Sequence, residues 1–64
     1  MDKYKIAYKI GNINTEVSSH KIDGFKRIVR ECELRNTPYQ VYELNNRNWI
    51  PIRREFVISE LLRK

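Results

Sequence analysis

The sequence has few of the residues from which small proteins build covalent or metal cross-links. Of its 64 residues, one is cysteine and one is histidine. A single cysteine cannot close a disulfide within the chain, and one cysteine with one histidine cannot hold a structural zinc ion. A chain of this length buries only about 60% of the surface that its unfolded form exposes. The sequence therefore predicts a single small domain, residues 1–64, with one thin core and no metal.

Other shortages restrict the chemistry. Two glycines are too few for a glycine-rich phosphate-binding loop, and no pair of carboxylates stands in a recognisable catalytic motif. Ser18, Ser19 and His20 are neighbours in the chain, but catalytic triads are assembled by position in space and not by adjacency. Cys32 falls among apolar residues, where a thiol is unreactive. We therefore expect no enzyme, no cofactor and no small-molecule substrate.

The chain also lacks any apolar run that approaches the roughly 20 residues of a membrane span. It shows no signal-peptide pattern, and a lone cysteine is typical of a reducing compartment. These observations predict a cytoplasmic protein without a membrane partner. Its formal net charge is +5, with the positive excess spread over both halves of the chain, so no basic tail stands apart from the domain.

Residues 3–10 alternate strictly between two kinds of side chain, which predicts a half-buried strand. One face carries tyrosine and isoleucine, and the other carries Lys3, Lys5 and Lys9. Gly11 and Asn12 follow as a two-residue hairpin turn, with Gly11 free to adopt a positive φ. The predicted register sets Ile6 opposite Val17 on the apolar face.

Residues 23–36 change to a helical period. The apolar positions Phe25, Ile28, Val29 and Cys32 form one stripe. Asp23 is the expected N-cap, and Asn36 is expected to end the helix. An alternative remains open, because the residues from Ile22 to Phe25 also resemble a hairpin turn, which would make residues 25–34 a strand in a small SH3-like β-barrel.

A second hairpin and a last helix complete the predicted order. Residues 39–44 read as a strand, 45–48 as a four-residue turn and 49–52 as a returning strand. Pro51 cannot donate a hydrogen bond to a neighbour, so this last strand is expected at an edge. Residues 54–64 read as a short helix that must dock on another element. The predicted fold is α+β, a small antiparallel sheet in the order β-β-α-β-β-α, with the central helix on one face.

The basic residues suggest one function. Lysines two apart on a strand are about 6.6–6.8 Å apart, close to the spacing of successive phosphates, and aromatic rings among cations are typical of single-stranded nucleic-acid binding. If Leu44 pairs with Trp49, then Tyr42 and Trp49 emerge on the lysine face. We predict a small basic regulatory or accessory protein that contacts nucleic acid through a sheet face. The candidate residues are Lys3, Lys5, Lys9, Tyr42, Arg47, Trp49, Arg53 and Arg54.

Two alternatives compete with that interpretation. The last helix would close a second core if it covered Tyr42, Leu44 and Trp49, which would hide the aromatic rings. The second alternative is a protein-binding module: a small inhibitor or adaptor of a larger enzyme, such as a phage-encoded one, or a homodimer. It would act through the C-terminal helix or an edge strand. The candidate residues of such a protein interface are Leu34, Val57, Ile58, Leu61 and Leu62.

Overall fold

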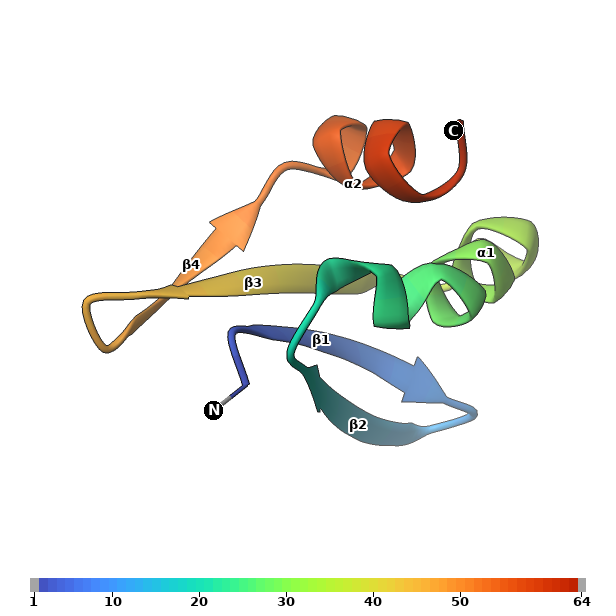
Figure 1. The fold of residues 1–64 in the computed structure, drawn as a ribbon. Helices are drawn as coiled ribbons and strands as arrows, with labels where there is room; N and C mark the ends of the chain where they lie inside the picture. Colours follow the sequence, from blue (N-terminus) through green and yellow to red (C-terminus); the bar gives the residue numbers. More distant parts are fainter. Residues whose placement is uncertain (1, 64) are drawn as a thin grey trace.

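A computed structural model, which describes residues 2–63, has an open antiparallel sheet with helices on one of its faces (Figure 1). The described elements are β1 (Tyr4–Ile10), β2 (Ile13–Ser19), the 3-10 turn η1 (Ile22–Phe25), α1 (Lys26–Arg35), β3 (Tyr39–Asn45), β4 (Asn48–Ile52) and α2 (Arg54–Leu61). The predicted α+β class and the order β-β-α-β-β-α are confirmed. The SH3-like barrel is wrong, because residues 26–35 are helical and the sheet stays open.

The sheet joins the two predicted hairpins through their first strands, in the order β2-β1-β3-β4. Within the first hairpin, Ile6 lies opposite Val17, and Gly11 has a φ of 62°, as the predicted turn requires. Between the hairpins, β1 and β3 pair antiparallel with Ile6 opposite Val41. In the second hairpin, Leu44 lies opposite Trp49, so the predicted registers of both hairpins are confirmed. Strand β4, which contains Pro51, lies at an edge as expected.

The core lies between the helices and one face of this sheet. Ile6 and Val41 are buried at its centre, and the helical layer contributes Phe25, Val29, Val57 and Leu61. Because α1 and α2 pack on the same pair of strand residues, they lie on the same side of the sheet (Figure 1).

This arrangement overturns two expectations for the last helix. The helix does not cover Tyr42, Leu44 and Trp49, because its apolar residues join the first core. Val57 and Leu61 are 1% and 2% exposed, so in this fold they are not available to a protein partner. Ile58 and Leu62 are half-buried, and Leu62 packs against the same core. Leu34 is 73% exposed, as its position on the predicted helix requires.

The ends of α1 correct one prediction and confirm another. Asp23 does not cap the helix; it lies within η1, and Phe25 occupies the N-cap position without a side-chain hydrogen bond. Glycine is needed at position 24 because a Cβ there would lie 2.6 Å from the Ser19 hydroxyl oxygen. At the other end, Asn36 adopts a left-handed φ of 54°. The amide of Thr37 then donates to the Cys32 carbonyl at 2.8 Å, a Schellman ending.

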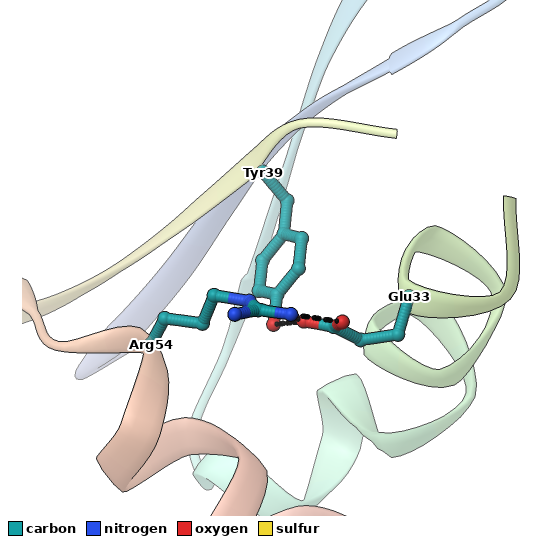
Figure 2. A network of polar contacts seen from close by, with 3 residues as sticks. All are labelled: Glu33, Tyr39 and Arg54. Atoms are coloured by element: carbon teal, nitrogen blue, oxygen red, sulfur yellow. Dashed lines mark hydrogen bonds and ion pairs between the residues drawn. The ribbon is translucent and has the colours of Figure 1, made fainter. Parts of the chain in front are cut away.

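The carboxylate of Glu33 ties α2 to the rest of the helical layer (Figure 2). The Arg54 guanidinium donates to both of its oxygens, from Nε at 2.8 Å and from Nη2 at 2.6 Å. The Tyr39 hydroxyl donates to Oε2 at 2.5 Å. Burial and the hydrogen bond to Glu33 raise the pKa of Tyr39, which favours the protonated hydroxyl that donates to Glu33. One side chain of α1 therefore holds the start of α2 and the start of β3.

Truncation of a core aromatic residue tests the thin core. Phe25 is fully buried, and Phe25→Ala removes about 3–5 kcal/mol, which is close to the whole stability of about 3–5 kcal/mol expected for a domain of this size. We expect the variant to lose its helical circular dichroism at room temperature. Phe56 is 51% exposed, and Phe56→Ala, the matched control, should retain the spectrum. Equal stability of the two variants would contradict this core.

The Glu33 contacts predict a specific acid sensitivity. Hydrogen bonds from Arg54 and Tyr39 hold the pKa of the Glu33 carboxyl below its ordinary value of 4.5. A carboxyl with a lowered folded-state pKa stabilises the fold above the unfolded pKa, and this stabilisation is lost as the pH falls through the folded-state value. Arg54→Gln should weaken the fold at neutral pH and reduce the further loss between pH values of about 5 and 3. Urea midpoints at each pH measure both effects.

The neighbouring arginine supplies the control for that experiment. Arg53 is exposed and precedes α2, so Arg53→Gln also removes one positive charge but leaves the hydrogen bonds to Glu33 in place. Its acid-induced loss of stability should match that of the wild type. The role of Glu33 would be refuted if both variants responded to acid in the same way.

Candidate nucleic-acid interface

The face of the sheet opposite the helices, here called the open face, brings the predicted lysines and aromatic residues together. Alternation from the buried Ile6 turns Lys5 and Lys9 to this face, and Lys5 lies directly opposite Tyr42. The amide of Leu44 donates to the carbonyl of Lys3 at 2.7 Å, which extends the same register by one residue. In the part of the chain that the structure describes, no helix covers this face (Figure 1).

Lys5, Tyr42 and Trp49 form a preformed group at the centre of the open face. The Lys5 ammonium nitrogen lies 5.2 Å from the ring centroid of Tyr42 and 4.8 Å from that of Trp49. Both distances fall within the range of cation–π attraction, in which a ring face attracts a positive charge. All three side chains are half-buried although no helix covers them, because they cover one another.

The rest of the open face is polar and has an excess of positive charge. Glu16, opposite Ala7, is the acidic residue that the described strands place there, against Lys5 and Lys9 on β1. Alternation along the strands turns five further side chains to the open face: Asn14, Ser18, Gln40, Leu44 and Pro51. Gln40 and Leu44 were not among the predicted site residues, although the alternation that selected Tyr42 also includes them. The Gln40 side-chain amide donates to the Ile52 carbonyl at 2.9 Å and so braces the edge strand.

Arg47 lies in the turn between β3 and β4, which is tighter than expected. Asn45 pairs with Asn48, so the loop has two residues and not four. Asn46 and Arg47 have φ values of 52° and 68°. Two positive φ values define a type I′ turn, in which the second position favours glycine. The exposed Arg47 therefore occupies a strained backbone position two residues before Trp49.

The other two predicted arginines do not join this group. Arg54 lies in the helical layer, where it binds Glu33, and so lies apart from the open face. Arg53 is exposed where β4 ends and α2 begins, and the β3–β4 register continued by one residue sets it opposite Gln40, at the edge of the open face and away from Trp49. The open face therefore combines Lys3, Lys5, Lys9, Tyr42 and Trp49, with Arg47 and Arg53 at its rim.

Other kinds of chemistry have little support among residues 2–63. Burial raises the pKa of the Cys32 thiol, which keeps it in the unreactive protonated form at neutral pH. No group of three or more metal-ligating side chains comes together in this part of the chain. None of the helices described is long and apolar enough to cross a membrane.

The comparisons with known proteins add no information about this face. No family model matches the chain, and neither a curated protein nor a solved structure matches it. Support for a function therefore comes from the geometry and charge of the open face.

Proposed function

We propose that the protein binds single-stranded nucleic acid through the open face of its sheet. The observation that carries this proposal is the group formed by Lys5, Tyr42 and Trp49 on a face that the helices leave uncovered. Sheets that bind single strands combine cations that follow the backbone with rings on which bases stack. In this proposal the protein is a small accessory factor of a reducing compartment, the cytoplasm, since Cys32 is free and buried.

The cations of the open face set how strongly binding should depend on salt. Lys3, Lys5, Lys9 and Arg47 supply four phosphate contacts, and each contact to a single strand contributes about −0.7 to the slope of log affinity against log salt. The four contacts together predict a slope of about −2.8, which is an affinity loss of about fiftyfold between 50 and 200 mM salt.

Stacking on the rings requires Lys5 to move. A cation–π contact at an exposed site stabilises by about 0.5–1 kcal/mol, whereas a stacked base contributes about 1–3 kcal/mol. Lys5 gives up two such contacts, about 1–2 kcal/mol together, and a stacked base and a new phosphate contact of Lys5 offset that loss. Binding should therefore change the fluorescence of Trp49, which is the single tryptophan of the chain.

Titration with single-stranded and duplex oligonucleotides at 50 and 200 mM salt tests the proposal. We expect the single strand to bind more tightly, to change Trp49 fluorescence and to show the salt dependence given above. Lys5→Gln should weaken binding and make the slope shallower by about 0.7. Arg30 is exposed on α1, on the opposite side of the molecule, and Arg30→Gln is the matched control that should change binding little. Absence of binding at low salt would overturn the proposal.

Arg47 allows a test in which stability and binding change in opposite directions. Arg47→Gly removes a side chain from a left-handed backbone position, which should stabilise the fold by about 0.5–1 kcal/mol and raise the melting temperature by about 4 °C. The same change removes a phosphate contact and should weaken oligonucleotide binding. Arg47→Ala is the matched control, because it removes the charge but keeps a Cβ at the strained position. It should weaken binding without raising the melting temperature.

A further inference from the structure

A groove lies on the helical side of the molecule, between α1 and the end of the β1–β2 hairpin. Its volume is about 470 Å³, within the range of about 300–1,000 Å³ usual for ligand sites. Its apolar lining comes from Tyr8 and Ile10 of β1 and from Ile28 and Cys32 of α1. Tyr8 and Ile10 point to the helical side of the sheet because they alternate with the lysines of β1, and Lys9 borders the groove from the open face.

The groove continues into an apolar surface at the tip of the hairpin. Ile10 pairs with Ile13 on the same face of the sheet as the buried Ile6. Ile10 and Ile13 are nevertheless 59% and 70% exposed, whereas Ile6 is fully buried. The helical layer therefore ends before the hairpin does. Two adjacent exposed isoleucines beside a groove form a continuous apolar surface. Such a surface is typical of a site for another polypeptide.

The rim of the groove determines the charge of that polypeptide. Lys9, Arg27 and Arg35 border it, and Glu31 is the acidic residue among those that line it. Glu31 pairs with Arg35 at 3.4 Å, and the lining residues, with three cations and one acid, keep an excess of positive charge. A second copy of this chain, with a net charge of +5, would meet repulsion here. An acidic segment would meet attraction.

We propose that this groove binds an acidic peptide segment of a partner protein, which inserts a large apolar side chain between Ile10 and Ile28. The carboxylates of the segment lie against Arg27 and Lys9, and its apolar residues cover Ile13. The isoleucines supply the burial that fixes the peptide, and the cations select its charge. Lys9 borders both this groove and the open face, whereas the other residues of the groove lie on the helical side of the sheet.

Nuclear magnetic resonance of the full ¹⁵N-labelled chain tests the proposal. The probe is the peptide acetyl-Glu-Asp-Phe-Glu-Asp-Leu-amide, and the reference is the same peptide with lysine in place of each acid. We expect the acidic peptide to shift the amide signals of Ile10, Ile13 and Ile28, and the basic peptide to shift none of them. Shifts elsewhere, equal shifts with both peptides, or none at millimolar concentration would overturn the proposal.

Substitutions separate the apolar contribution from the electrostatic one. Ile10→Ser should weaken the peptide at least about fivefold, because its buried contact is lost. Ile50→Ser is the matched control: Ile50 is 47% exposed on β4 but does not line the groove, so affinity should change less than about twofold. Affinity unaffected by Ile10→Ser in a folded variant would contradict the proposal.

The charge test does not depend on the isoleucine. Arg27→Glu should weaken the acidic peptide, whereas Arg63→Glu changes the net charge equally at an exposed position outside the groove lining and should have little effect. If both charge variants weaken the peptide equally, the attraction comes from net charge and not from this rim, and the proposal fails. Lys5→Gln should leave peptide binding unchanged, which separates this test from that of the open face.

Discussion

The register in which β1 pairs with β3 determines what each side of the molecule can do. It sets Ile6 opposite Val41 beneath the helices, and on the other side it sets Lys5 opposite Tyr42. Because side chains alternate along a strand, a slip of one residue would bring a lysine into the core and an isoleucine to the open face. The core and the proposed interface are thus two consequences of one pairing, and a change of register would disrupt both.

The sequence predicted most of what depends on neighbours along the chain. Alternation and short turns set the faces of each hairpin, and the helical stripe identified the buried side of α1. The pairing between the hairpins and the docking of α2 depend on residues far apart in sequence. Arg54 is 21 residues from Glu33, and no local pattern links them. The type I′ turn was also missed, because Arg47 stands where such turns favour glycine. The groove exists because the β1–β2 hairpin extends beyond the end of α1, and hydrophobic periodicity does not reveal how far each element extends.

The shortage of apolar residues explains why the molecule has one covered face and one open face. The described residues bury a small set of apolar side chains, and α2 contributes Val57 and Leu61 to that set. A second core under Tyr42 and Trp49 would have required Val57 and Leu61 to leave the first core. The apolar residues of α1 alone could not fill the space that they occupy there. With both helices on the same side, the aromatic residues of the other face are left to cover one another with the help of Lys5.

That use of Lys5 has a consequence for the behaviour of the free protein at high concentration. An uncovered sheet with half-buried aromatic residues is a surface on which two copies of the chain can stack face to face. In such a stack the ammonium group above Tyr42 and Trp49 would meet its counterpart from the other molecule, and both charges would lose their water. The same lysine that contacts the aromatic rings should therefore oppose self-association through this face.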